Sequence, residues 1–385
     1  MTTRDFAAQD PSSVLRVALL HNYREDQQPS MRLYGDRLGV ALARRGLAVR
    51  RVRPPGVVPD AWRARSASWN KLDGYMGRFV VYPRLVRDLN ADIVHVVDHG
   101  QGYLVNNLDP SRTVVTCHDV ILLALASGRI GQMPVPRIAL HLLRMSLEAM
   151  KNAAAVIADS TQTKLDLVRF MDMEPAKVTV IHPGLNQPFR PDPARRLAAR
   201  LRFGLGDGLV ILQIGRGFYK NLAGVLRVLR KLRIDGLDVR VARVGPSLSG
   251  ADRALAERLG VLGSVSELGM VPDEEMPSLY NAVDVLLFPS LYEGFGWPPL
   301  EAMASGVPVV CSRAGSLDEV VGQAALTADP DDVEALAWHV GSVLGDARLR
   351  EALIARGLQH AAQFSWDRTA AQAIEIYRRV LDRTG

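Results

Sequence analysis

Residues 289–306 read PSLYEGFGWPPLEAMASG, and this stretch is the most informative in the chain about its fold. We expect an apolar strand to end at Phe288, after which Gly294 and Gly296 allow a sharp turn because they lack a Cβ atom. The two prolines that follow suit the first turn of a helix, where a missing N–H group costs little. A short helix is expected to open at Glu301. The stretch thus predicts a strand, a glycine turn and a helix, the unit from which parallel α/β sheets are built.

This unit has the chemistry of an anion site. Backbone N–H groups and the positive end of a helix dipole at the edge of a strand suit a diphosphate. Glu293 and Glu301 border the turn, and carboxylates can accept hydrogen bonds from the vicinal hydroxyls of a ribose or a hexose. Singly, Glu301 would be a first-turn carboxylate and Glu293 a solvated loop residue. Their spacing together with the glycines and prolines favours a binding site.

A second turn, residues 213–222 (QIGRGFYKNL), has a similar layout. A strand runs into Gly215, and Arg216 and Lys220 flank the turn before the next helix. Two cations there could neutralise a diphosphate without a metal, the arginine through a bidentate fork and the lysine as a point charge. A solvated lysine at the start of a surface helix is the plainer interpretation of this turn taken alone.

Hydrophobic periodicity predicts two successive α/β series. Short β-branched runs alternate with amphipathic stretches, and the pattern breaks at residues 182–193, where four prolines and a glycine indicate a linker. Parallel sheets bind ligands at the carboxyl ends of their strands. An apolar stripe at helical spacing over residues 366–381 predicts a final amphipathic helix. The expected strands are 14–20, 47–52, 92–97, 113–117, 155–158 and 178–181, then 209–214, 239–244, 264–268, 283–288 and 307–311.

The chain resembles family 4 glycosyltransferases, retaining transferases of group 1 with the fold called GT-B. Glu293, seven intervening residues and Glu301 match the E-x7-E signature of that family, within the run YEGFGWPPLEAMASGVPVV. The similarity extends over most of the chain. Further matching elements are the T-x-H-D element at 116–119, the interdomain run at 177–184, the phosphate-binding turn at 215–221, and the closing F-S-W with its final helix at 364–377.

The resemblance implies two facing Rossmann-like α/β domains with an interdomain cleft and a C-terminal helix that crosses back to the N-terminal domain. We expect a polar tail over 1–13 and an acceptor-binding domain over 14–186, completed by the returning helix 366–385. A nucleotide-sugar-binding domain is expected over 187–365.

Residue roles follow from the same resemblance. Glu301 is expected to bind the nucleotide's ribose, and Glu293 the hydroxyls of the donor sugar. Arg216 and Lys220 are expected to hold the diphosphate, while His118 contacts the donor sugar from the opposite domain. The expected catalytic residues are therefore His118, Arg216, Lys220 and Glu293, and the substrate-binding set also contains Gly215, Gly294, Phe295, Gly296, Glu301 and Asp119.

The family's chemistry implies transfer of a hexosyl unit from GDP-mannose or a UDP-hexose to a saccharide, lipid-linked or small-molecule acceptor. The leaving phosphate helps to deprotonate the acceptor, so neither a protein nucleophile nor a metal cofactor is expected. Two departures from the family pattern bear on this. The loop at residues 21–30 lacks the common Gly-Gly pair, and Tyr219 stands before Lys220 where an arginine is common.

Three alternatives stay open at this point. A nucleotide-sugar isomerase or a non-catalytic binding protein could use the same scaffold, and a glycoside hydrolase would use Glu293 and Glu301 as its acid and base. Metal sites are disfavoured. His95 and His99 lack further ligands at a familiar spacing. Asp329 and its neighbours, which match a D-x-D motif, are better explained as caps of a helix from Val333.

Composition indicates a folded intracellular protein. The 385 residues, 48% hydrophobic and 23% charged, predict two or three domains, and two cysteines indicate a reducing compartment. The polar N-terminus lacks a secretory apolar run, so a cytoplasmic location is expected. Nucleic acid is not an expected partner, because no recognised binding fold accompanies the charge.

Residues 44–87 carry most of the excess positive charge. Ten arginines and one lysine face two aspartates there, a net charge of +9. Two interpretations stay open, a set of solvated arginine-rich helices or peripheral contact with the anionic inner face of a membrane. The interleaved aromatic residues are Trp62, Trp69, Tyr75, Phe79 and Tyr82, and the cations beside them are Arg63, Arg65, Lys71, Arg78, Arg84 and Arg87.

Overall fold

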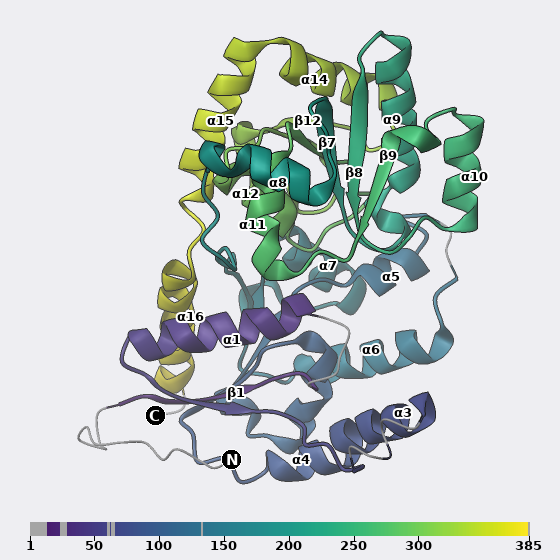
Figure 1. The fold of residues 1–385 in the computed structure, drawn as a ribbon. Coiled ribbons are helices and arrows are strands. Elements are labelled where there is room, and N and C mark those ends of the chain that lie inside the picture. The colour runs from purple at the N-terminus through teal and green to yellow at the C-terminus, as the bar shows by residue number, and fades with distance from the viewer. Residues whose placement is uncertain (1–13, 24–28, 60–61, 63–65, 132–133, 384–385) are drawn as a thin grey trace. The chain divides into compact units, whose positions relative to one another are not determined.

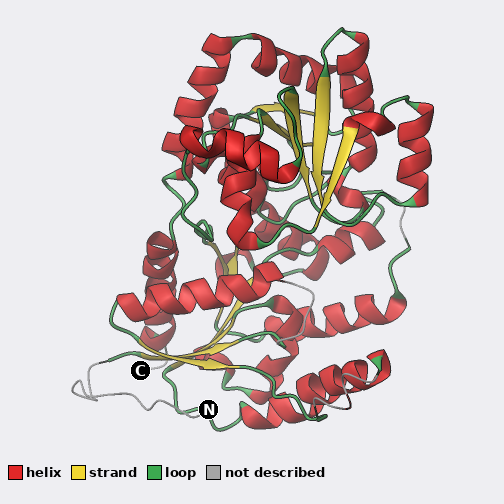
Figure 2. Ribbon diagram, in the orientation of Figure 1, coloured by secondary structure: helices red, strands yellow, loops and turns green. Residues whose placement is uncertain are grey.

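A computed structural model describes residues 14–23, 29–59, 62, 66–131 and 134–383 (Figure 1). The described chain forms two compact units, unit 1 with residues 1–186 and 365–385 and unit 2 with residues 187–364. The tail expected over 1–13 lies outside the described residues, as do Arg63, Arg65 and residues 24–28 of the loop after the first strand. Each unit holds strands in yellow with red helices around them (Figure 2).

Unit 1 contains a parallel sheet of six strands in the described residues, in the order β2-β1-β3-β4-β5-β6. The inner strands β3, β4 and β5 are buried throughout, whereas the edge strands β2 and β6 are partly exposed. The strands are β1 (Arg16–Leu20), β2 (Ala48–Val52), β3 (Ile93–Val96), β4 (Thr113–Cys117), β5 (Ala155–Ala158) and β6 (Val178–Val180). The helices are α1 (Pro29–Arg44), α3 (Ala67–Met76), α4 (Tyr82–Leu85), α5 (Ile121–Ala126), α6 (Arg137–Met150), α7 (Thr161–Met171) and α16 (Trp366–Asp382).

Unit 2 repeats the architecture with the order β12-β11-β10-β7-β8-β9, again all parallel. Its main hydrophobic cluster joins the sheet to α9 and α14. The strands are β7 (Leu209–Ile214), β8 (Val239–Val244), β9 (Val265–Gly269), β10 (Val285–Phe288), β11 (Val309–Ser312) and β12 (Leu326–Ala328). The helices are α8 (Arg196–Phe203), α9 (Leu222–Ile234), α10 (Gly250–Arg258), α11 (Met276–Ala282), α12 (Trp297–Ala304), α13 (Leu317–Val321), α14 (Val333–Gly345) and α15 (Ala347–Ala361).

The expected fold class, an α/β protein with two Rossmann-like units, is confirmed by these two sheets. Four of the expected strands match in full, namely β4, β5, β7 and β8, and the others differ from their expected ranges by a residue or two at one or both ends. Strand β12, which is three residues long, was not expected. Asp332, rather than Asp329, caps α14, with its carboxylate accepting from the N–H of Ala335.

The final helix belongs to unit 1, as the family resemblance implies, and its apolar stripe is the buried side. Helix α16 begins after Ser365, whose hydroxyl oxygen accepts from the N–H of Arg368, and it buries Ala370, Ala373, Ile374, Tyr377 and Val380. The Tyr377 hydroxyl lies 2.7 Å from Nδ1 of His95, a residue of β3. The helix is therefore fastened to the first sheet by a buried polar contact in addition to its apolar face.

Strand order fixes where a ligand site can form in each unit. In unit 2 the chain builds the sheet outward in one direction from β7 and in the other from β10, and these two strands are neighbours. Open parallel sheets bind ligands beside such a reversal, at the carboxyl ends of the two strands. The turn after β7 is residues 215–220, and the turn after β10 is residues 289–296. Both sequence motifs thus flank the reversal point of the second sheet.

Asp284 lies directly before β10, at the edge of the sheet opposite to the two turns, and binds the start of β7. Its carboxylate accepts from Arg196 Nη2 at 2.6 Å, from Arg200 Nη2 at 2.7 Å and from the N–H of Val210 at 2.8 Å. Arg200 is buried, so loss of its partner would leave a cation without compensation.

We therefore expect Asp284→Ala to lower the free energy of unfolding by about 3 kcal/mol, measured by urea denaturation. Asp238→Ala is the matched control, because Asp238 pairs with Arg233 at an exposed position. That control is expected to change stability by less than about 0.5 kcal/mol. Equal effects of the two substitutions would contradict the structural role of Asp284.

Candidate active site

The turn after β7 takes a shape that glycine permits. Gly215 has φ 136°, and a Cβ atom there would lie 2.7 Å from Cγ of Lys220. The chain then passes the exposed Arg216 and forms a 3-10 turn, Phe218–Lys220, before Asn221 caps α9 by accepting from the N–H of Gly224. The turn folds the Lys220 side chain back across the end of β7.

Two hydrogen bonds join this turn to the one after β10. The N–H of Leu291 donates to the carbonyl of Tyr219 at 2.7 Å, and the Asn221 amide donates to the carbonyl of Pro289 at 3.1 Å. The predicted phosphate turn and the glycine-rich turn therefore form one connected structure, although the sequence separates them widely.

An ion pair lies at the junction of the two turns. Lys220 Nζ is 2.7 Å from Glu293 Oε1, and the two side chains are only 14% and 10% exposed. The ammonium group also lies over the rings of Tyr219 and Phe288, at 5.2 and 4.8 Å from their centroids. Such a cation is held in place by charge and by ring quadrupoles before any ligand arrives. The Glu293 carboxylate lies beside this ammonium group at the junction of the two turns.

The helix after the glycine turn begins earlier than expected. Helix α12 starts at Trp297, with Gly296 as N-cap at φ 110°, so Glu301 lies in its second turn and the expected start at Glu301 is wrong. Two of the first three helical residues are prolines and have no N–H group to offer an anion. The helix end thus supplies fewer donors than expected, and more of any anion binding falls to the side chains and the preceding turn.

Glu301 projects from α12 toward α11. Its Oε2 accepts a hydrogen bond from the buried Tyr280 hydroxyl at 2.9 Å. Desolvation of the carboxyl group raises the pKa of Glu301 to about 7, and the charge of Asp273 acts in the same direction, while the bond from Tyr280 lowers it. A carboxyl group that titrates near neutrality is a common mark of a functional site.

The remaining residues of the glycine turn are packed rather than exposed. Phe295 is buried and meets the rings of Trp297 and Phe364 edge to face. Ser316 donates to the carbonyls of Glu293 and Phe295 at 3.2 and 2.6 Å, which fixes the backbone on both sides of Gly294. The turn that carries Glu293 is therefore rigid.

In unit 1 the predicted site residues follow β4. His118 is buried, with Nδ1 at 2.6 Å from Asp159 Oδ2 and Nε2 at 2.8 Å from the carbonyl of Val97. Burial lowers its pKa, but the charge and hydrogen bond of Asp159, together with Asp98, raise the pKa of His118 to about 9. The ring is an imidazolium at neutral pH and donates from both nitrogens. A direct hydrogen bond from it to a sugar would require one of these bonds to break.

Asp119 has a local role in this structure. It is half-buried, and its carboxylate accepts from the N–H of Ile121 at 3.0 Å, at the start of α5. After the neighbouring strand β3, the buried Asp98 accepts from the N–H of Gly100 and from the Asn22 amide. Strands β1, β3, β4 and β5 thus bring polar residues to one edge of the first sheet.

The residues considered for metal binding have other contacts. The ring nitrogens of His95 lie 2.7 Å from the Tyr377 and Thr116 hydroxyls. Within the described residues, no group of three or more His, Cys, Asp or Glu side chains is arranged to hold a metal ion. Cys117 and Cys311 are both buried free thiols.

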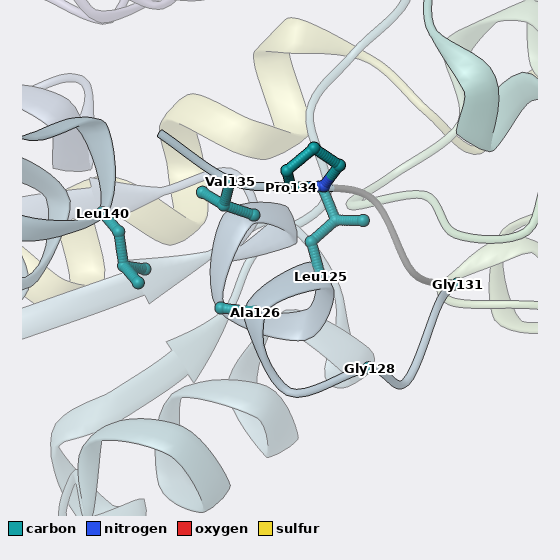
Figure 3. Close-up of a pocket in the computed structure, with 7 residues that line it drawn as sticks. All are labelled: Leu125, Ala126, Gly128, Gly131, Pro134, Val135 and Leu140. Atoms are coloured by element: carbon teal, nitrogen blue, oxygen red, sulfur yellow. The ribbon is translucent and has the colours of Figure 1, made fainter. Parts of the chain in front are cut away.

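A pocket of about 470 Å³ also lies in unit 1, and none of the predicted site residues lines it (Figure 3). The pocket is lined by Leu125, Ala126, Gly128, Gly131, Pro134, Val135 and Leu140.

None of the helices in the described part of the chain has an apolar run long enough to cross a bilayer.

The structure therefore brings Gly215, Lys220 and Glu293 together at one edge of unit 2, with Arg216 in the same turn and Glu301 on the following helix. His118 and Asp119 occupy the corresponding edge of unit 1.

Sequence reasoning missed Asp159 and Tyr280. Asp159 directly follows the correctly expected strand 155–158, so the carboxyl-end rule could have found it. Tyr280 gave no signal, because its contact joins two helices.

Two family models match the chain. The model described as glycosyl transferases group 1 matches residues 202–360, and the model described as glycosyltransferase family 4 matches residues 34–187. The O-antigen chain mannosyltransferase B of Escherichia coli is 32% identical over 307 residues, which are 78% of this chain and 78% of that relative. The D-inositol 3-phosphate glycosyltransferase of Corynebacterium urealyticum is 35% identical over 60% of this chain and 58% of its own length.

Among solved structures, Anabaena HepE in complex with UDP-glucose superposes with a TM-score of 0.71 at 17% identity. The match covers 94% of this chain and 98% of that one, and it shows a shared fold. The length and identity of the match to the Escherichia coli relative, together with the two family models, establish the activity class. The chain belongs to the family 4 glycosyltransferases of group 1, enzymes that transfer a sugar from a nucleotide sugar.

Proposed function

We propose that this enzyme retains anomeric configuration while it moves a hexosyl unit from GDP-mannose or a UDP-hexose to an acceptor, without a metal ion. The observation that carries the proposal is the pair of joined turns at β7 and β10, where Lys220 and Glu293 meet at 2.7 Å. Family membership favours this transferase hypothesis over the isomerase, binding-protein and hydrolase alternatives.

In the proposal, unit 2 binds the donor. Lys220 and Arg216 hold the diphosphate, Glu293 accepts hydroxyls of the sugar, and Glu301 accepts those of the ribose. Gly215, Gly294, Phe295 and Gly296 shape the backbone around the diphosphate. The Lys220 ammonium is compensated by Glu293 in this structure. A diphosphate would take over that ammonium and leave the Glu293 carboxylate to accept sugar hydroxyls.

Catalysis then rests on stabilising the departing diphosphate. Charge builds up on the leaving phosphate as the glycosidic bond breaks, and fixed cations in a desolvated site stabilise it without reorganisation. The phosphate removes the acceptor's proton on the same face of the sugar, so the stereochemistry is retained without a protein nucleophile. Lys220 suits this role because its charge is largely desolvated and its position is fixed by ring contacts.

Unit 1 is proposed to bind the acceptor, with Asp119 beside it. His118 would supply a permanent positive charge near the donor sugar, since its hydrogen bonds keep it protonated. The names of the relatives bear on the substrates. The Escherichia coli relative is named for mannosyl transfer to an O-antigen chain, and HepE was solved with UDP-glucose, so both donors enter the test. Saccharide, lipid-linked and small-molecule acceptors fit the proposal, within polysaccharide biosynthesis.

We further propose that helix α3 contacts an anionic membrane surface. Trp69, Leu72 and Tyr75 lie at helical spacing and are 37%, 44% and 55% exposed. The acidic residue of this helix, Asp73, points inward and accepts from the N–H groups of Val57 and Val58. The exposed side is thus apolar and cationic.

The other residues of the basic stretch differ in exposure. Lys71 is exposed on α3 and gives this surface a positive charge, and Arg84 and Arg87 are exposed in and just after α4. Aromatic rings that enter the interface and cations that meet anionic headgroups are the features of peripheral membrane binding. Tyr82, expected among the surface aromatic residues, is not part of this surface, because its ring is buried and its hydroxyl donates to the carbonyls of Val52 and His21.

Turnover tests the donor proposal. A thermal-shift panel of nucleoside diphosphates and nucleotide sugars with EDTA present first selects the donor, because a ligand that binds only the folded state raises the melting temperature. We expect donor consumption in EDTA with wild-type enzyme and acceptor. Lys220→Ala should lower kcat/KM by about 10² to 10³. Lys231→Ala, the removal of a lysine on the exposed side of α9, is the matched control and should leave turnover unchanged.

Three results would contradict the donor proposal. If no compound of the panel raised the melting temperature, nucleotide-sugar binding would be contradicted. If EDTA blocked turnover and Mn²⁺ restored it, metal independence would be contradicted. Full activity of Lys220→Ala would remove the proposed stabilisation of the leaving group. Inversion of configuration in the product, measured by NMR, would contradict retention.

The charge of His118 can be measured directly. We expect its ring resonances, assigned by comparison with His118→Asn, to stay at imidazolium positions until the pH approaches 9. Asp159→Asn should lower the pKa, because it removes the charge that holds the proton. Since the pKa is raised in the folded state, the pair stabilises the fold fully below pH 6.5 and loses this effect as the pH rises through about 9.

Asp109→Asn serves as control, since Asp109 is exposed and pairs with Arg112. An unchanged His118 titration in Asp159→Asn would rule out the proposed source of its charge. A neutral ring at pH 7 in the wild type would do the same.

Vesicle co-sedimentation tests the membrane proposal. We expect the protein to pellet with vesicles of 30% phosphatidylserine in phosphatidylcholine, and less as NaCl is raised, because salt screens the attraction. Trp69→Ser with Tyr75→Ser should lower the partition coefficient at least about tenfold. Trp338→Ser, the loss of an exposed tryptophan on α14 of unit 2, should not. Pelleting that is indifferent to salt and to the α3 substitutions would overturn the proposal.

A further inference from the structure

The Tyr280 hydroxyl has two acceptors and one proton. It lies 2.9 Å from Glu301 Oε2 and 3.3 Å from the carbonyl of Pro298, and the whole side chain is buried. Phe189 meets its ring edge to face, with centroids 5.6 Å apart, so the hydroxyl is held at a fixed position between α11 and α12. Only rotation of its O–H bond decides which acceptor receives the proton.

Protonation of Glu301 would reverse the direction of this contact. An ionised carboxylate accepts the Tyr280 proton. A protonated carboxyl group can instead donate its own proton to the Tyr280 oxygen, while the tyrosine donates to Pro298. In both arrangements the Tyr280 hydroxyl donates one hydrogen bond, and the extra proton comes from solvent. In the second arrangement, however, the carboxyl group has lost its charge and is a weaker acceptor for donor hydroxyls.

We propose that Tyr280 is a positioning residue that holds Glu301 as an oriented carboxylate and thereby makes donor affinity depend on pH near neutrality. The inference rests on the proposed role of Glu301 in binding the donor's ribose. It goes beyond that role because Tyr280 itself would touch no substrate.

The charges around Glu301 support this inference. Desolvation raises the pKa of Glu301 to about 7, Asp273 on the preceding 3-10 turn Asp273–Glu275 adds to the rise, and Tyr280 on α11 opposes it. Burial and the neighbouring Glu301 raise the pKa of Tyr280 itself, so Tyr280 stays protonated and able to donate at every pH of interest. Among the described residues, Tyr280 and Asp273 are the titratable groups that act on Glu301.

Donor affinity should therefore fall below pH 7 and level off above it. Tyr280→Phe removes the hydrogen bond that favours the charged form of Glu301. The pH below which donor affinity falls should therefore rise by about one unit. Isothermal titration with GDP-mannose and UDP-glucose measures this, since neither probe titrates between pH 6 and 8.5. The expected loss of affinity is about eightfold at pH 6.5 and less than twofold at pH 8.5.

Recovery at high pH separates positioning from a structural defect, which would weaken binding equally at both pH values. Tyr82→Phe is the matched control, because it removes a buried hydroxyl whose acceptors are backbone carbonyls in unit 1. Its affinity profile should match the wild type. In a Glu301→Gln background, Tyr280→Phe should have no pH-dependent effect, since no carboxylate remains to be held. Equal losses at both pH values, or a pH-dependent loss that persists with Glu301→Gln, would overturn the inference.

A measurement without ligand keeps this inference separate from the proposed function. Because the pKa of Glu301 is higher in the folded state, its contribution to stability should fall as the pH rises from about 4.5 to about 7 and then level off. This contribution is measured in urea unfolding as the difference in free energy of unfolding between a protein with Glu301 and the same protein with Glu301→Gln. In the Tyr280→Phe background the fall should continue to about pH 8. If neither probe binds the wild type, the donor role fails while this comparison still decides the Tyr280 contact. If the contribution of Glu301 becomes constant at the same pH with and without the Tyr280 hydroxyl, the inference is refuted.

Discussion

The pairing of β7 with β10 is the constraint on which the rest of unit 2 depends. The two strands are parallel neighbours from which the chain builds the sheet in opposite directions, so their carboxyl ends open side by side. Two turns with quite different sequences are thereby brought within hydrogen-bond distance, and Leu291 and Asn221 join them through the backbone of the opposite turn. Lys220 and Glu293 meet only because of this strand order. Any change that shifted the register of β10 on β7 would separate them.

Buried charge is handled in the same way at each proposed site. Lys220 has Glu293, His118 has Asp159, and Glu301 has the Tyr280 hydroxyl, each pair at hydrogen-bond distance. Desolvation makes an unpaired charge costly, so each partner keeps its neighbour in the form and orientation that binding needs. Preorganised groups of this kind lose little energy in reorganisation when charge develops on a substrate. The partners were harder to foresee than the charges, because they come from elements distant in sequence.

Local sequence predicted the elements well where periodicity or turn chemistry was strong. The strand at 113–117 is confirmed, since the preference of β-branched runs for strands acts over a few residues. The start of α12 was misjudged by four residues, because prolines allow a helix to begin before them as well as at them. Tyr82 was expected on the surface yet lies in the core, because an amphipathic stretch does not reveal which of its sides meets the sheet.

The sequence by itself determined the α/β class, the two series of strands and helices, the family, and the residue types that carry charge at each turn. These depend on interactions within a few residues and on motifs read along the chain. Tertiary structure alone decided that Lys220 pairs with Glu293, that Asp159 keeps His118 protonated, and that Tyr280 reaches Glu301. Each of these contacts joins separate strands or helices, and their ionisation depends on burial, which is a property of the packed molecule rather than of any segment.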